Sequence, residues 1–323
     1  MLEFLQALKQ IRVIEPANEE RTANVKLRAL FIALSLIVLA IAVNAQERRM
    51  KIYISADMEG VVGVVSGEQL GPTGFEYARF REFMTQEVNA AIQGAMAAGA
   101  TEFVVSDSHG NGQNLLIEKL PSNVWVVRSW PRPLGMMQGI DETFAGAIFI
   151  GYHTSTSNLD GVRAHTLSSA RLTEVRLKGV AVSEAGINAA IAGQFNVPVI
   201  MVSGDDTVVK ETSALLGNLE GAIVKYASGF HSAKTMTPES SYQLIRTKAE
   251  AAVRRIRDFK PHKLAGPIEL DVSFKNYRAA EVLSYLSIVQ RTSSHSIRFV
   301  GKDMTEVSKF LTFINTYEPG LEP

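Results

Sequence analysis

Residues 51–60, KIYISADMEG, combine a strand-like run with two acids at its end. Apolar side chains such as Ile52 and Ile54 occur at every second position, which is the period of a β-strand. Asp57 and Glu59 follow directly. Taken alone, Asp57 is most simply a turn former or helix cap, and Glu59 is a solvated loop acid. Whether the two acids have a function depends on what the rest of the chain brings to the same place.

The chain after this stretch alternates strand-like and helix-like segments. A four-residue apolar periodicity predicts a helix over about 75–98,. Short apolar strands separated by helices are typical of an α/β fold, a mostly parallel sheet with helices on both faces. Towards the C-terminus the pattern changes to that of a smaller α+β unit. The sequence therefore predicts an N-terminal extension over 1–45, an α/β domain over 46–206 and a smaller α+β region over 207–323 packed against it.

Composition excludes several classes of function. The 323 residues are 46% hydrophobic and 20% charged, as in an ordinary globular protein,. The formal net charge is zero, so no global field attracts nucleic acid or anionic lipid, and we expect a small-molecule partner and no nucleic acid,. The chain has no cysteine, which excludes disulfides, thiolate catalysis and cysteine-based zinc sites,. Any metal must therefore be held by His, Asp and Glu.

The N-terminal segment resembles a secretory signal. Lys26 and Arg28 precede a 15-residue, almost entirely apolar run at 29–43, and Ala45 is a small residue at a suitable cleavage position,. These features predict export, with cleavage after Ala45 and a periplasmic or secreted mature protein. An uncleaved membrane anchor is the alternative, although the run is shorter than the roughly 20 residues that span a bilayer. A cytoplasmic location fits these features less well.

Further acids and histidines follow the other predicted strands. Ligands of open α/β sheets bind outside the carboxyl ends of the strands, so residues that follow different strands can meet in one crevice. Six side chains fit that placement: Asp57, Glu59, His109, His153, His165 and Glu184. Each alone has an ordinary structural interpretation, such as a polar turn, a histidine at the edge of the core, or a carboxylate favoured by a helix N-terminus. Their joint placement indicates a metal site.

Metal-dependent hydrolysis is the chemistry that this set supports. Two divalent cations about 3.5 to 4 Å apart need a bridging carboxylate and further His, Asp or Glu ligands, and they convert bound water to hydroxide near neutral pH. Zinc suits imidazole and carboxylate ligands. His165, twelve residues past His153, would be free for proton transfer or for stabilising an oxyanion. The residues alone predict a dinuclear metallohydrolase.

Longer blocks of the sequence resemble a known family. The DppA-type D-aminopeptidases, which are zinc-dependent exopeptidases, contain in the same order blocks similar to ISADMEGVVG, VVSDSHGNGQNLLIEKL, DETFAGAIFIGYH, RAHTLSS, VAVSEAGINAAIAGQFNVPVIMVSGDD and KDMTE. The resemblance runs from Met50 to the last predicted helix, and residues 1–49 lie outside it. It implies an α/β domain that carries a zinc pair, a smaller α+β domain beside it, and a homo-oligomer built as a pentameric ring or a decamer of two such rings.

The resemblance also implies roles for individual residues. It implies two zinc ions per subunit with these ligands: Asp57 as the bridge, Glu59 and His153 completing one site, and His109 and Glu184 completing the other. His165 matches the catalytic histidine of the family, near the metal-bound water and the scissile carbonyl. All the expected residues are present in this sequence.

The reaction implied by the resemblance removes an N-terminal residue, with a preference for D-amino acids such as D-alanine, from short peptides. The attacking group would be a hydroxide held by the two zinc ions. One alternative is an L-aminopeptidase or an amidase, because the same ligand set activates water without reading the substrate. A second alternative is an exported peptide-binding protein without catalysis, which would need no complete ligand set.

Overall fold

The computed structural model describes residues 28–35 and 50–317. The chain divides into two units, Met1–Arg49 and Met50–Pro323, and each is considered by itself. In the first unit, residues 28–35 form a helical segment. The predicted cleavage position after Ala45 lies outside the described residues. Within the described ranges, no helix has the length and apolar character needed to cross a membrane.

A seven-stranded sheet forms the centre of the second unit, with the strand order β3-β2-β1-β4-β7-β8-β9. Neighbouring strands run parallel from β3 to β8, and β9 is antiparallel to β8. The strands are β1 (Lys51–Ala56), β2 (Glu102–Asp107), β3 (Val124–Val127), β4 (Gly146–Tyr152), β7 (Val199–Asp205), β8 (Glu220–Gly229) and β9 (Ser232–Thr235). The mostly parallel sheet predicted from the sequence is confirmed.

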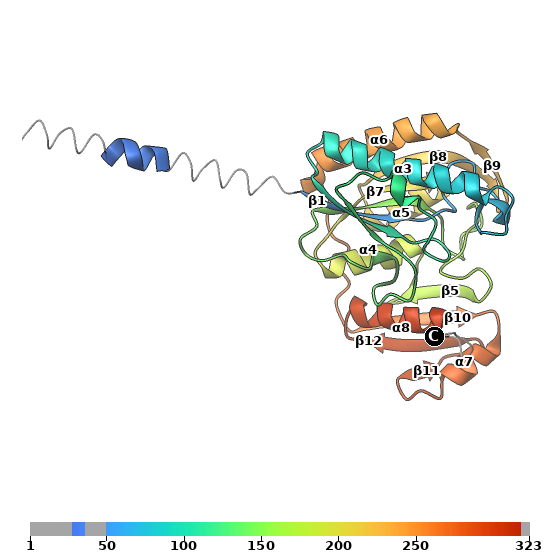
Figure 1. The fold of residues 1–323 in the computed structure, drawn as a ribbon. Coiled ribbons are helices and arrows are strands. Elements are labelled where there is room, and N and C mark those ends of the chain that lie inside the picture. Colours follow the sequence, from blue (N-terminus) through green and yellow to red (C-terminus); the bar gives the residue numbers. More distant parts are fainter. Residues whose placement is uncertain (1–27, 36–49, 318–323) are drawn as a thin grey trace, which may run out of the picture. The chain divides into compact units, whose positions relative to one another are not determined.

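Helices cover both faces of this sheet (Figure 1). Helices α3 (Tyr77–Ala97) and α6 (Pro238–Arg254) pack on one face, against the side of β1 that carries Ile52 and Ile54. Helix α4 (Glu184–Gln194) and Val208 of α5 (Asp206–Leu216) share a core with Tyr53, which points to the other face. Alternate residues of β1 are thus buried on opposite faces, as expected for a central strand of a parallel sheet.

A second, antiparallel sheet has the strand order β11-β12-β10-β5-β6. Its strands are β5 (Leu172–Leu177), β6 (Val180–Ala181), β10 (Ile268–Phe274), β11 (Val289–Arg291) and β12 (Ser296–Gly301). Helix α7 (Tyr277–Leu283) contacts β10, β11 and β12, and helix α8 (Met304–Thr316) contacts both β12 and α4. Helix α8 therefore links the second sheet to the helical layer of the first (Figure 1). Four short 3-10 helices complete the description: η2 (Gly67–Gln69), η3 (Ile117–Lys119), η4 (Gly135–Met137) and η5 (Ile256–Asp258).

The two sheets do not divide the chain between residues 206 and 207, where the sequence analysis places a domain boundary. Strands β8 and β9 come after that position but extend the first sheet, whereas β5 and β6 come before it and belong to the second. The segment between β4 and α4 thus leaves the first sheet, supplies two strands to the second sheet, and returns. A boundary drawn along the sequence could not represent this exchange.

Candidate metal centre

The carboxyl ends of three neighbouring strands meet at one place. Asp57 and Glu59 follow β1, His109 follows β2, and His153 follows β4. Strand β1 lies between β2 and β4. After β1 the chain adds β2 and β3 on one side of it, and then adds β4, β7 and β8 on the other side. Such a switch in strand order is the usual ligand site of an open α/β sheet. The fold therefore places these four side chains around one crevice.

Two glycines let the loop after β1 pass close to the end of β4. A Cβ atom on Gly60 would lie 2.1 Å from the carbonyl oxygen of Tyr152. Gly151 has φ +70°, and a Cβ there would lie 2.2 Å from the carbonyl oxygen of Asp57. The Gly60 N–H donates to the Gly151 carbonyl at 2.7 Å. Any larger residue at either position would push Asp57 away from His153.

Asp57 faces a different histidine with each of its carboxylate oxygens. Its Oδ1 is 3.2 Å from His109 Nδ1, and its Oδ2 is 3.3 Å from His153 Nε2. Glu59 Oε2 lies 2.9 Å from the same nitrogen of His109. Glu184 Oε1 lies 3.5 Å from the same nitrogen of His153. Asp57 is thus shared between two groups of possible ligands, all of them buried.

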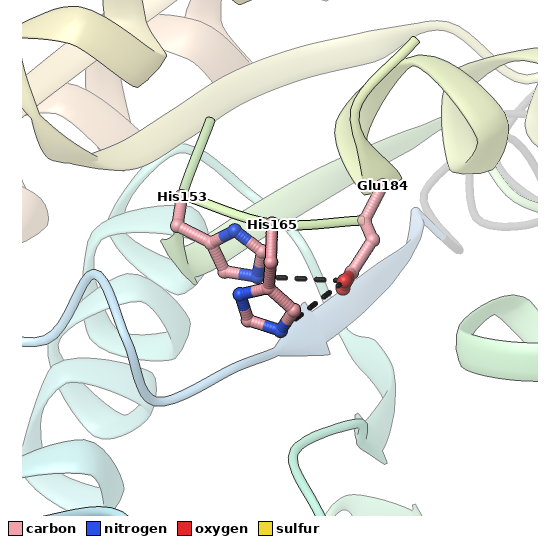
Figure 2. Close-up of side chains that lie close together, drawn as sticks. All are labelled: His153, His165 and Glu184. Atoms are coloured by element: carbon pink, nitrogen blue, oxygen red, sulfur yellow. Dashed lines mark ion pairs between the residues drawn. The ribbon is translucent and has the colours of Figure 1, made fainter. Parts of the chain in front are cut away.

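His165 belongs to the group on the Glu184 side. Its ring stacks on that of His153, with centroids 4.0 Å apart and planes inclined by 7°. Its Nε2 lies 3.9 Å from Glu184 Oε1, and Figure 2 shows both imidazoles beside this carboxylate. Two groups of three residues could each hold an ion, because the ligand atoms within each group lie within 4.8 Å of one another. The groups are Asp57, Glu59 and His109, and His153, His165 and Glu184.

All six predicted site residues lie in this cluster, but their proximity differs from the pairing that the resemblance implies. Glu59 contacts His109, whereas the resemblance places it with His153. Glu184 lies beside His153, whereas the resemblance places it with His109. Sequence spacing does not show which carboxylate lies beside which histidine, because this pairing depends on side-chain rotamers in a crowded site. Metal-content measurements on double variants distinguish the two pairings.

Each of the three histidines has one ring nitrogen held by a backbone carbonyl. The contacts are His109 Nε2 to Leu70 O at 2.7 Å, His153 Nδ1 to Thr154 O at 3.0 Å, and His165 Nδ1 to Arg163 O at 2.8 Å. A ring N–H that donates to a carbonyl leaves the other nitrogen facing the carboxylates, as in a metal-ligating imidazole. A lone pair that faces a carboxylate repels it unless a proton or a cation lies between them.

The carboxylates raise the pKa values of the buried histidines. Burial disfavours the charged imidazole of His109, but Glu59 and Asp57 outweigh it and hold its pKa well above the ordinary value. At His153, burial is outweighed in the same way by Glu184 and Asp57, and its pKa is also raised well above the ordinary value. Burial and the neighbouring Glu59 raise the pKa of Asp57. The cluster therefore demands positive charge, which either protons on the histidines or divalent cations supply.

A hydrogen-bonded loop positions His109. Asp107, the last residue of β2, accepts hydrogen bonds from the backbone N–H groups of Asn114 and Leu115 at 2.6 and 2.7 Å. The Asn114 side chain donates in turn to the His109 carbonyl at 2.7 Å. Asp107 thus closes the loop that presents His109 to the carboxylates.

Two buried charged residues that the sequence analysis did not single out hold the loop after β1. Lys225 of β8 donates through Nζ to three carbonyl oxygens, those of Glu59 at 2.5 Å, Val61 at 3.0 Å and Val64 at 2.7 Å. Glu87 of α3 accepts a hydrogen bond from the Val62 N–H at 3.0 Å. It accepts a second one from the hydroxyl of Ser241, which belongs to α6. From the sequence alone, Lys225 would be expected to be exposed, because the segment around it was not predicted as a strand. In the structure it is only 1% exposed.

The free energy of unfolding should depend on pH through Glu87. Burial raises the pKa of Glu87 to about 7, above the value of 4.5 for the unfolded chain. Its contribution to stability is therefore fully present below about pH 4.5 and is lost as the pH rises through about 7. The loss corresponds to roughly 3 kcal/mol. Glu87→Gln should remove that part of the pH dependence, measured by urea unfolding of metal-free protein at pH 4.5 and pH 8.

Glu82→Gln on the same helix is the matched control. The Glu82 pKa is lowered, first by its hydrogen bond with Lys119, so its contribution to stability is lost as the pH falls. Removing Glu82 should therefore leave the loss of stability towards pH 8 intact. An equal pH dependence in the parent protein and in Glu87→Gln would show that Glu87 is ionised in the folded protein like an ordinary carboxylate.

A cavity of about 310 Å³ opens from the cluster towards α4 and α8. One part of its lining is the cluster itself, and another part is apolar, from Met136, Ile187, Ile191 and Leu311. Ser308 and Thr312 of α8 add hydroxyl groups. An apolar cavity with a few polar groups beside perturbed ionisable residues is the usual form of a substrate site.

An α/β sheet whose switch point gathers three buried carboxylates and three oriented imidazoles defines a metal-dependent hydrolase. Comparison with known proteins agrees with this class. The Peptidase_M55 family model, described as D-aminopeptidase, matches residues 50–313, so the chain belongs to this family. The family and the enzyme class implied by the resemblance are thereby confirmed.

Two relatives show the extent of the similarity. A D-aminopeptidase of Bacillus subtilis (strain 168) is 34% identical over 258 residues, which are 80% of this chain and 93% of that protein. The solved structure of the Zn-dependent D-aminopeptidase DppA from Bacillus subtilis, a self-compartmentalizing protease, matches with a TM-score of 0.79 and 31% identity. The match covers 84% of this chain and 100% of that one. The predicted fold class, an α/β domain with a smaller α+β part, is confirmed.

Proposed function

We propose that the protein is a zinc-dependent D-aminopeptidase that removes N-terminal D-amino acids from short peptides with two zinc ions per subunit. The observation that carries the proposal is the position of Asp57, whose two oxygens face His109 and His153 at 3.2 and 3.3 Å. A carboxylate shared by two ligand groups is what a dinuclear site requires. Membership of the D-aminopeptidase family supports the reaction and the chirality.

The donor set fits zinc. Imidazole and carboxylate ligands suit this ion. In the described part of the chain, Asp57 Oδ2 and His153 Nε2 are buried, face each other and have no hydrogen-bond partner, as expected for atoms that bind a cation. Asp57, Glu59, His109, His153 and Glu184 would hold the two ions. When bound, zinc supplies Lewis acidity that activates water and polarises a carbonyl group.

His165 is the residue that we assign to proton transfer. Its Nδ1 is held by the Arg163 carbonyl, so its Nε2 is the nitrogen directed at the cluster. His165 is more exposed than its neighbour, with 14% of its side chain accessible against 1% for His153, and it lines the cavity. From there Nε2 takes a proton from the attacking water and, as an imidazolium N–H, donates a hydrogen bond to the oxygen that becomes negative. It then passes this proton to the departing amine.

The cavity favours small substrates. A volume of about 310 Å³ is at the lower end of ligand cavities and suits one or two residues of a short peptide,. The apolar part of its lining suits a small aliphatic side chain such as that of D-alanine.

We further propose assembly and export. The matched DppA is a self-compartmentalizing protease, which supports a homo-oligomer for this chain, and light scattering of the purified protein would test it. Export is supported by the basic flank and apolar run before Ala45,. Fractionation of the native cells, with the intact mass of the mature chain, tests both the location and a start at Gln46.

A panel of D- and L-aminoacyl amides, assayed with and without a chelator, tests the proposed reaction. The zinc-loaded enzyme should hydrolyse D-alanyl amides roughly 10- to 200-fold better than the L-isomers, the discrimination that placing one methyl-sized group in an apolar pocket provides. The chelator should reduce hydrolysis to the background rate. Turnover of L-substrates alone would contradict the assigned chirality. Absence of turnover together with absence of bound zinc would favour a peptide-binding protein.

A further inference from the structure

We propose that Asn188 recognises the free α-amino group of the substrate through its side-chain oxygen Oδ1. The inference rests on the proposed aminopeptidase function, since such an enzyme must distinguish a free N-terminus from an interior peptide bond. It concerns a residue that lies outside the metal ligands and the proton-transfer histidine. Two features of the structure support it: the position of Asn188 on α4 and the direction of its hydrogen bonds.

Asn188 lies one helical turn after Glu184, so the two side chains share a face of α4,. It lines the cavity beside the metal cluster, together with Ile187 and Ile191 of the same helix, and is only 2% exposed. In an aminopeptidase the free amine is separated from the scissile carbonyl by a single carbon atom. A group that binds the amine must therefore lie next to the metal centre, as Asn188 does.

Hydrogen bonds fix the orientation of the Asn188 amide. Its Nδ2 contacts the Tyr152 hydroxyl oxygen at 2.8 Å and the Met136 sulfur at 3.1 Å. The Tyr152 hydroxyl donates its own hydrogen to Ser55 Oγ at 2.8 Å, so it can only accept from Asn188,. The amide NH₂ group thus uses both hydrogens on buried neighbours. No donor among the residues that the structure describes reaches Oδ1, which is therefore the atom available to a molecule in the cavity.

The chemistry of this position favours an ammonium group. An amide oxygen accepts a charge-assisted hydrogen bond from N⁺–H, and such bonds are stronger than those between neutral groups. A substrate whose amine is blocked cannot donate in the same way and would leave a buried acceptor unpaired, which lowers its affinity.

A matched pair of ligands tests the role of Asn188. D-alanine and propionate differ only by the ammonium group, and both can be measured as competitive inhibitors of the zinc-loaded enzyme. The parent enzyme should bind D-alanine more tightly than propionate. In Asn188→Ala this preference should fall roughly tenfold or more, the effect of losing a hydrogen bond to a charged group, while propionate binds as before. Any contact of the amine with a metal is common to both proteins and cancels in the comparison.

Two further variants guard against a structural explanation. Ser308→Ala removes a different polar group from the same cavity and should keep the preference of the parent enzyme. Asn188→Asp keeps an oxygen and adds negative charge, so it should raise the preference for D-alanine. This variant tests the role of Asn188 even if Asn188→Ala does not fold. An unchanged preference in either Asn188 variant would overturn the inference while the aminopeptidase activity stands. A zinc-loaded parent enzyme that hydrolyses no aminoacyl amide would instead overturn the proposed function.

Discussion

Asp57→Asn should cost the enzyme both zinc ions and reduce hydrolysis to the level of the chelated enzyme. The carboxylate faces His109 with one oxygen and His153 with the other, so it serves both groups of ligands. Asparagine keeps only one acceptor oxygen and no negative charge. Metal content measured by plasma emission spectroscopy after dialysis should fall from two ions per chain towards zero. Retention of one tightly bound ion would show that Asp57 is not shared.

Glu59→Gln is the matched control, because Glu59 contacts only the His109 side of the cluster. This variant should lose one ion and keep the other. Adding His109→Ala should then cause no further loss if these two residues hold the same ion, as their proximity in the structure favours. Loss of the second ion in that double variant would favour the pairing implied by the family resemblance, in which Glu59 acts with His153.

His165→Ala should lower kcat by roughly 10²- to 10⁴-fold, the usual contribution of a general acid or base, while both zinc ions stay bound. The Nε2 of His165 lies 3.9 Å from Glu184, farther than the corresponding atom of His153 at 3.5 Å, and the residue lines the cavity. Added imidazole should restore part of the activity, since a small base can occupy the vacated space. The measurements are kcat with D-alanyl amides and the metal content of the same preparation.

The assignment of His165 to proton transfer has a clear competitor. His165, His153 and Glu184 are close enough to hold an ion together, so His165 could be a ligand. Loss of one zinc ion from His165→Ala would establish that reading. His231→Ala is a suitable control, because His231 is exposed and contacts the Val65 carbonyl at the surface. It should change neither the metal content nor kcat.

Elements with a strong period could be predicted from the sequence, and elements without one could not. The helix predicted over 75–98 is α3 (Tyr77–Ala97), and the strand-like run that starts at residue 51 is β1 (Lys51–Ala56). Strand β8 was missed, because Lys225 interrupts its apolar pattern. The physical reason is that Lys225 is buried to hold the loop after β1, a tertiary contact with residues more than 160 positions away.

The residues of the candidate site were predictable for a different reason. Parallel strands end at the same edge of a sheet, so Asp57, His109 and His153 could be brought together from their positions alone. The contact between Glu59 and His109 depends on rotamers and could not be derived from spacing. Asn188 was missed because it stands inside a helix of small residues, where its role follows only from hydrogen bonds to Tyr152 and Met136.

Helix α8 lines the cavity but supplies none of the six residues of the metal cluster. The six residues of the cluster come from segments that precede α5. Ser308, Leu311 and Thr312 also line the cavity, but they come from a helix near the C-terminus that contacts the second sheet. Substitutions along that one helix can reshape the space for a substrate side chain without touching any of the six. The preference for a substrate side chain can thus change through α8 while the six residues of the cluster stay the same.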